Sequence, residues 1–247
     1  MTAPRPARMN CDAIAPYYHL LERLSFGNAL HRTRCTYLNE VKTAHRALLC
    51  GDGDGRFLAA LLRANPHVEV DFVDLSPRMI QLARRRIAKI DRAAERVENS
   101  GSNPRAAATA RVRFWPADVA EFVPPWPAPN YDVIVTHFFL DCFCDAELAQ
   151  LVPRIASWAA PNALWLISDF RESETPLGRL YTHAIIRSLY AAFRLTTGLR
   201  VTQLPNYKSA LASANAQPLQ ETNSLSGLLH ASLWRLPTRP IKQSNSP

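Results

Sequence analysis

Three glycines at alternate positions are the residues whose spacing points most directly to chemistry. Gly51, Gly53 and Gly55 follow the short apolar run Ala47–Cys50 and precede apolar residues at helical spacing. Only glycine lets a backbone turn this tightly and approach a ligand this closely. A glycine loop that opens a helix N-terminus suits a nucleotide-like or carboxylate-bearing ligand. A tight turn that binds nothing would give the same pattern.

Two aspartates after later strands narrow this ligand to a nucleoside. Asp74 ends the predicted strand Val68–Leu75, where a carboxylate can accept hydrogen bonds from both ribose hydroxyls. The dinucleotide fingerprint is Gly-x-Gly-x-x-Gly, which the spacing here does not match. Asp118 follows the third predicted strand in the sequence PADVAEF, where an Ala-Asp pair is expected of a carboxylate that contacts an adenine amine.

The loop after the fourth predicted strand is the best candidate for the substrate side. In open α/β sheets, ligands lie beyond the carboxyl ends of the strands. His137 could serve there as a general base, since its ordinary pKa near 6.5 suits proton transfer at neutral pH, or it could simply bond a backbone carbonyl at the strand end. Asp141 could orient His137, bind substrate, or cap the following helix.

Three further residues are candidates for substrate contact. Phe138 could flank the acceptor or belong to the core. Tyr17, in an N-terminal helix, could fold over the site as part of a lid or only cover the sheet. Arg171 follows the fifth predicted strand, where it could meet an anionic acceptor or remain solvated. No cluster of cysteine or histidine has the spacing of a metal site.

These residues must be positioned by alternating strands and helices, which predict an α/β fold with a doubly wound, mostly parallel seven-stranded sheet. An antiparallel C-terminal hairpin joined at Ser226-Gly227 and N-terminal cap helices complete the prediction. The predicted strands are 47–50, 68–75, 111–115, 131–136, 163–169, 218–224 and 228–236. The predicted helices are 15–26, a stretch from Asn28, 55–64, a stretch after Ser76-Pro77, 145–159, 175–197 and 207–215.

Length and composition fit one enzyme domain. The 247 residues are 47% hydrophobic, which is enough for one core over residues 11–236, divided into a helical cap (11–46) and a Rossmann-like core (47–236). Residues 1–10 and 237–247 are expected to be disordered. No apolar run is long enough for a secretory signal or a membrane span, and five scattered cysteines suggest reduced thiols, so we expect a cytoplasmic protein.

On these residues the chain resembles the class I methyltransferases that use S-adenosylmethionine (SAM), and among them the small-molecule group that includes the ubiquinone and menaquinone biosynthesis enzymes. The resemblance covers roughly 48–236 and implies that SAM is the cofactor. It implies that the glycines surround the methionine part, with Asp52 as a substitute contact to its amino group. The remaining implied cofactor contacts are Asp74 with ribose, Asp118 with adenine, and Val119, Leu75 and Met79 beside them.

The family's glycine loop usually opens with an acidic residue, whereas here Cys50 precedes Gly51 and the acids Asp52 and Asp54 lie between the glycines. This departure leaves a non-catalytic SAM-binding protein as one alternative. The net charge of +8 leaves a nucleic-acid methyltransferase as another, although Thr136–Phe139 is not the Asn/Asp-Pro-Pro-aromatic motif of base-modifying enzymes. An NAD-linked dehydrogenase is disfavoured by the glycine spacing. The acceptor and the oligomeric state are left open.

Overall fold

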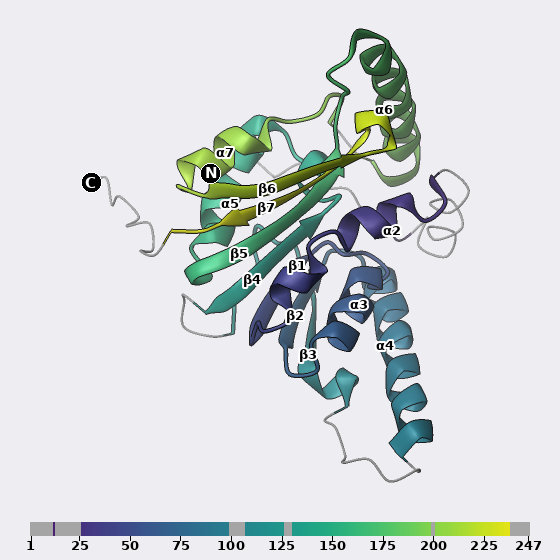
Figure 1. Ribbon diagram of the computed structural model, residues 1–247, viewed down its shortest axis with the longest axis vertical. Coiled ribbons are helices and arrows are strands. Elements are labelled where there is room, and N and C mark those ends of the chain that lie inside the picture. Colours follow the sequence, from purple (N-terminus) through teal and green to yellow (C-terminus); the bar gives the residue numbers. More distant parts are fainter. Residues whose placement is uncertain (1–11, 13–25, 99–106, 126–129, 199–200, 238–247) are drawn as a thin grey trace, which may run out of the picture.

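One seven-stranded sheet organises the computed structural model, which describes residues 12, 26–98, 107–125, 130–198 and 201–237 (Figure 1). The strand order is β3-β2-β1-β4-β5-β7-β6. The first five strands are parallel, and β7 runs antiparallel between β5 and β6. The bounds are β1 (Arg46–Cys50), β2 (Glu69–Asp74), β3 (Val112–Pro116), β4 (Tyr131–His137), β5 (Ala159–Phe170), β6 (Gln217–Ser224) and β7 (Leu229–Arg235). The predicted fold class is confirmed.

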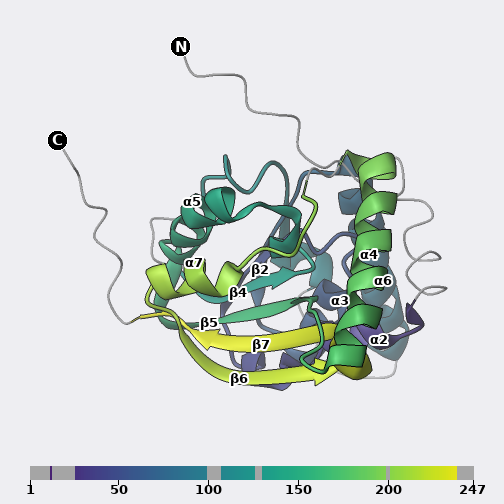
Figure 2. The same ribbon diagram turned by 90° about the horizontal axis from the view of Figure 1, so that it is seen from above.

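Helices cover both faces of this sheet, as Figures 1 and 2 show. α5 and α7 lie on one face, and α2, α3 and α4 lie on the other. α6 packs beside the join between β6 and β7. The bounds are α2 (Ala29–Arg34), α3 (Arg56–Ala64), α4 (Pro77–Glu98), α5 (Asp145–Ala156), α6 (Pro176–Thr197) and α7 (Tyr207–Ser213), with short 3-10 turns η2 (Leu38–Val41), η3 (Ala108–Arg111), η4 (Leu140–Cys142) and η5 (Leu225–Gly227).

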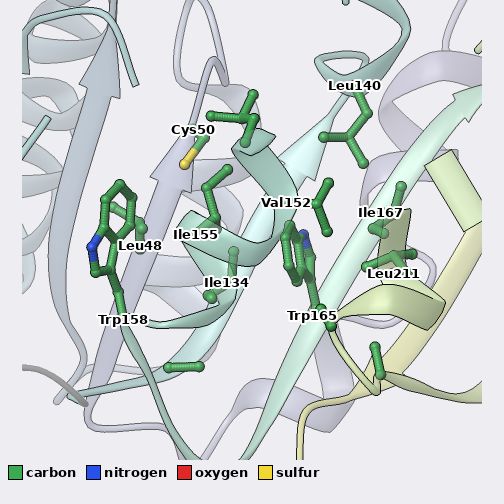
Figure 3. Packing of buried hydrophobic residues seen from close by; sticks show 14 of the residues in the cluster. Leu48, Cys50, Ile134, Leu140, Val152, Ile155, Trp158, Trp165, Ile167 and Leu211 are labelled. Carbon is green, nitrogen blue, oxygen red and sulfur yellow. The ribbon is translucent and has the colours of Figure 1, made fainter. Parts of the chain in front are cut away.

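Alternation along the central strands builds two apolar layers. In β5, Trp165 and Ile167 pack with α5 and α7, whereas Leu164 and Leu166 pack with α3. Figure 3 shows the first of these layers, in which the Trp165 ring lies near Val152 of α5 and Leu211 of α7. Both layers bury large aliphatic and aromatic side chains, so the sheet is a rigid platform for the loops at its ends.

The carboxyl ends of the parallel strands meet at one edge of the sheet. β1 ends at Cys50, β2 at Asp74, β4 at His137 and β5 at Phe170. Because β1 and β4 are neighbours that lead to helices on opposite faces, the crevice between their loops is where an open α/β sheet binds its ligand. The loops that carry nearly all the predicted site residues therefore converge there.

Several boundaries differ from the predictions. β5 begins at Ala159 rather than at residue 163, because Ala159 pairs with Tyr131 across a register shift. The join between β6 and β7 is longer than the predicted Ser226-Gly227 dipeptide, since it forms η5 with Leu225 and Ser226 at positive φ. The predicted helix 15–26, except Phe26, and the tail beyond residue 237 lie outside the described residues. No helix in the described ranges is both long and apolar enough to span a membrane.

Candidate cofactor and acceptor site

The outer glycines of the loop are required by the packing around them. Gly51 and Gly55 have φ values of +67° and +74°. A Cβ atom on Gly51 would lie 2.4 Å from the Phe139 ring, and one on Gly55 would lie 2.6 Å from the Ala83 side chain. These contacts hold the glycine loop against the loop after β4 and against α4. A side chain at either position would displace one of these partners.

The middle glycine has a different role. Gly53 also has a positive φ, of +61°, but a Cβ there would meet only the Met79 sulfur atom, at 4.0 Å. The space above Gly53 is therefore open to a ligand, and the small residue keeps it so. Met79 itself is 2% exposed and forms an apolar wall beside this space.

Asp74 joins the end of β2 to this loop. Its Oδ2 accepts a hydrogen bond from the Gly53 N–H (3.2 Å), and its Oδ1 accepts one from the Ser76 N–H (2.8 Å). Each carboxylate oxygen can accept a second hydrogen bond, so the group can still bind two adjacent hydroxyls. Burial raises the pKa of Asp74 to about 7, the Ser76 and Gly53 hydrogen bonds oppose that rise, and the nearby Asp12 carboxylate adds to it.

The two acids between the glycines differ in what they already bind. Asp54 forms ion pairs with Arg56 (3.1 Å) and Arg86 (2.6 Å), which tie the loop to α3 and α4. Asp52 accepts the Leu58 N–H through Oδ2 (3.0 Å), whereas its buried Oδ1 meets no donor in the described part of the chain. Only Asp52 therefore keeps a carboxylate oxygen available for a ligand at this position.

Burial dominates the protonation of Asp52 and raises its pKa to about 7. The Arg34 guanidinium opposes this rise. Arg34 comes from α2, is only 4% exposed, and lies 4.9 Å over the Phe138 ring. Arg34 is not predictable from the sequence, because an amphipathic helix pattern does not show which arginine turns inward.

The predicted adenine contact lies next to Asp74. Ala117 N–H donates to the Asp74 backbone carbonyl (3.1 Å), which places the following residue, Asp118, beside the end of β2. Asp118 Oδ1 accepts the Ala120 N–H (2.9 Å) and so fixes the turn. Val119, next to Asp118, is buried, and Leu75, the residue after Asp74, is 37% exposed. The surface between Asp74 and Asp118 is suited to a flat, partly apolar ring.

His137 ends β4 on the face that packs against α2 and α3. Its ring meets the Phe57 ring edge-on, with centroids 4.6 Å apart, and both ring nitrogens are buried without a hydrogen-bond partner in the described residues. Burial, with a smaller contribution from Arg34, lowers the pKa of His137 well below its ordinary value. The imidazole is therefore neutral at physiological pH. Its role as a general base stays a prediction.

Two carboxyl groups meet beyond β4 and β5. Asp141, in η4, contacts Asp169, the penultimate residue of β5, and both are buried. Burial raises the pKa of each, and for Asp169 the Asp141 carboxyl raises it further. Asp141 is one of the residues predicted from the sequence, whereas Asp169 is not. The signal that could have found Asp169 is a charged residue at the end of an otherwise apolar strand.

The other predicted substrate residues are placed differently. Phe138 has a positive φ of 53° and packs against Phe170 (centroids 5.2 Å apart) at the start of the loop after β4. Arg171 bonds Asn223 (3.3 Å) and pairs with Glu174, so its guanidinium already has two partners. Tyr17 lies outside the described residues. The contacts of all three with substrate stay predictions.

Taken together, these carboxylate acceptors and the space beside them fit SAM. The open face at Gly53, the unpaired Oδ1 of Asp52 and the remaining acceptor capacity of Asp74 suit an amino-acid chain joined to a ribose. Val119, Leu75 and Met79 supply apolar contacts beside them.

Comparison with known proteins points to methyltransferases. Residues 48–165 match the family model described as "Methyltransferase domain". A malonyl-[acyl-carrier protein] O-methyltransferase of Halalkalibacterium halodurans is 29% identical over 133 residues, which are 53% of this chain and 41% of that protein. The chain therefore spans about two fifths of the length of this curated relative.

Solved structures share the fold at low identity. The mitomycin 7-O-methyltransferase MmcR superposes with a TM-score of 0.60 and 18% identity, over 89% of this chain and 57% of that chain. The N-methyltransferase NodS from Bradyrhizobium japonicum WM9, in complex with S-adenosyl-L-homocysteine (SAH), superposes with a TM-score of 0.52 and 16% identity, over 85% and 84% of the two chains. Residues 48–165 are therefore similar to a methyltransferase domain, and the chain shares its fold with these solved methyltransferases.

Proposed function

We propose that the chain transfers the methyl group of SAM to a small-molecule acceptor bound beyond the carboxyl ends of β4 and β5. One observation carries the proposal, namely that Asp74 reaches across to the Gly53 N–H and still keeps acceptor capacity on both oxygens. The match to a methyltransferase domain over residues 48–165 supports SAM as the ligand of this carboxylate.

In this proposal each side chain binds one part of the cofactor. Asp52 Oδ1 accepts the ammonium group of the methionine part, for which a buried, unpaired carboxylate oxygen is well suited. Asp74 accepts the two ribose hydroxyls, and Asp118 accepts the adenine amine. The apolar side chains of Leu75, Met79 and Val119 contact the ribose and the adenine ring.

The protein has little acid-base chemistry to perform. Bound SAM supplies a methyl group already activated on a sulfonium. The chain's task is to hold the acceptor in line and to exclude water. The loop after β4, fixed to the glycine loop by the contact of Phe139 with Gly51, is the wall against which we place the acceptor. His137 and Asp141 are the proposed catalytic residues on this loop.

Calorimetry of the purified chain with SAM, SAH and NAD tests the cofactor. We expect saturable binding of SAM and SAH and none of NAD. Release of SAH across a panel of small alcohols, phenols, carboxylic acids and amines then tests turnover. Binding of NAD alone would refute the proposal, and SAM binding without turnover on any acceptor would support a non-catalytic role. Salt-dependent RNA or DNA binding with methyl incorporation would move the acceptor to nucleic acid.

A further inference from the structure

The Asp141–Asp169 pair contains one of the buried side chains whose polar atoms lack a hydrogen-bond partner among the described residues. Asp169 is 1% exposed, and neither of its oxygens has a hydrogen-bond donor of good geometry among the described residues, although the Asp141 backbone N–H lies close enough to oppose the rise in its pKa. Asp141 is 6% exposed, and its Oδ1 accepts only a weak hydrogen bond from the Cys142 thiol (S···O 3.5 Å). No ion pair with lysine or arginine is found for either carboxyl among the described residues.

Such a pair is costly for a fold to keep. Buried polar groups are nearly always hydrogen-bonded, and two adjacent carboxyls without donors cannot both ionise. The free protein therefore holds them as a proton-sharing pair, consistent with the raised pKa of both groups. Structural carboxylates elsewhere in the sheet are treated differently: Asp71 accepts from Arg113, Trp115 and Tyr131.

The pair lies where an acceptor must lie. β4 is the neighbour of both β1 and β5, so the pair is about two strand spacings, roughly 10 Å, from the glycine loop along the same edge of the sheet. Phe139, two residues before Asp141, packs on Gly51, and the Tyr190 hydroxyl donates to the Asp141 backbone carbonyl (3.2 Å). These contacts fix η4 between the cofactor loop and α6.

We propose that Asp141 and Asp169 together bind the protonated amino group of the methyl acceptor, so that the acceptor is an amine. The inference rests on the proposed function. An ammonium group carries up to three donors and a full positive charge, which lets both carboxyls ionise. A neutral hydroxyl has one donor and leaves the repulsion between the carboxyls uncompensated.

A divalent metal ion is a weaker fit to the same chemistry. Ca²⁺ takes about six to eight oxygen ligands, and the described residues contain no group of three or more His, Cys, Asp or Glu side chains that could hold a metal ion. Mg²⁺ can bind through one or two carboxylates and water, so titration with MgCl2 tests it directly. His137, the nearest histidine along the chain, faces Phe57 in the layer with α2 and α3. An amine needs no further ligand.

The pair also accounts for the proton that an amine must lose. One carboxylate takes a proton from the ammonium group, so an O–H bond forms as an N–H bond breaks. The freed nitrogen lone pair then forms the new N–C bond as the bond between methyl and sulfur breaks, leaving a neutral thioether. The proton leaves the pair for solvent after the product departs. Atoms and charges balance without a further reactant.

The test compares amines with alcohols of the same shape. SAH-loaded protein is titrated with n-propylammonium and n-propanol, and with benzylammonium and benzyl alcohol, by calorimetry in two buffers of different ionisation enthalpy. We expect at least one ammonium ion to bind tenfold or more tightly than its alcohol, with release of a proton. Equal affinity within both pairs, no binding of any probe, or binding of MgCl2 in their place would overturn the proposal.

Variants connect this preference to the pair. Asp169→Asn and Asp141→Asn should lose the preference while their SAH affinity stays within twofold. Glu147→Gln is the matched control, since it removes a nearby carboxylate that only bonds the Cys144 N–H (2.9 Å). Retained preference in both pair variants would refute the assignment. If SAH fails to bind, the proposed function fails, and the same titration of free protein still tests the pair.

Discussion

The Asp74 carboxyl and the Gly53 N–H meet at 3.2 Å, and this hydrogen bond joins the end of β2 to the middle of the glycine loop. Gly53 is also the glycine of the loop with open space beside it. The acceptor capacity of Asp74 and the space at Gly53 therefore belong to one surface. This relationship makes the cofactor assignment testable at single residues.

Replacing Asp74 with alanine should remove most of the SAM affinity. Hydrogen bonds to charged groups contribute about 1.5–3 kcal/mol each, so losing two predicts a fall of roughly 100-fold or more. Calorimetry with SAM measures the change. Asp132→Ala is the control, because Asp132 binds the His45 and Arg46 N–H groups at the opposite edge of the sheet. Unchanged affinity in Asp74→Ala would refute the ribose assignment.

SAM affinity should rise with pH through about 7. The pKa values of Asp74 and Asp52 are both raised to about 7, mainly by burial. The ionised carboxylates accept the ribose hydroxyls and the ammonium group, so binding strengthens as these protons leave. One such group predicts about a tenfold gain between pH 6 and pH 8.

Calorimetric titrations at half-unit steps of pH would measure this dependence. Asp74→Asn should flatten the curve, since an amide does not titrate, and should leave only the part due to Asp52. A profile that is flat in the unmodified protein, or that falls as pH rises, would mean that these carboxyls do not bind the cofactor in their ionised form.

The glycine loop and the end of β2 could be predicted because their signals are local. Glycines at positive φ, an acid at the end of an apolar strand and a Ser-Pro helix start each follow from the chemistry of neighbouring residues. Gly51, Gly53 and Asp74 therefore lie in the predicted loop and strand end. The alternation of strands and helices likewise predicts the doubly wound sheet, although not the order of its strands.

The contacts among residues on the proposed acceptor side of the site could not be predicted from the sequence. Asp141 meets Asp169 after a turn that begins at Phe138, whose left-handed backbone conformation is rare for phenylalanine and has no signal in the sequence. Arg34 turns inward to Asp52 and Phe138 although its helix pattern is only amphipathic. Both contacts join residues from separate segments, so no spacing in the sequence encodes them.

Gly53→Ala should separate ligand binding from stability. A left-handed alanine costs about 1–2 kcal/mol of folding free energy, and among the described residues the new methyl group would meet only the Met79 sulfur, at 4.0 Å. Gly198→Ala is the matched control, since Gly198, at the end of α6, has a φ of +73° and a Cβ there would meet no described atom within 4 Å. Denaturant unfolding should give similar losses for both variants, whereas only Gly53→Ala should lose SAM affinity. Equal SAM affinity in the two variants would refute the proposal that SAM occupies the space beside Gly53.

His137→Ala tests the predicted general base. The imidazole is neutral near pH 7 because burial lowers its pKa, so it can accept a proton from an acceptor that reaches it. We expect the variant to lower kcat by tenfold to 100-fold while SAM affinity stays within about twofold. The contact with Phe57 is also lost, so unfolding by denaturant must be measured with turnover.

Two further variants separate catalysis by His137 from packing. His137→Phe restores an aromatic ring against Phe57 without a basic nitrogen, and His45→Ala removes an exposed imidazole whose side chain is 90% accessible. A catalytic His137 predicts that His137→Phe recovers stability but not turnover, whereas His45→Ala changes neither. Recovery of turnover in His137→Phe would make this histidine a packing residue and leave the Asp141–Asp169 pair as the proton acceptor of the site.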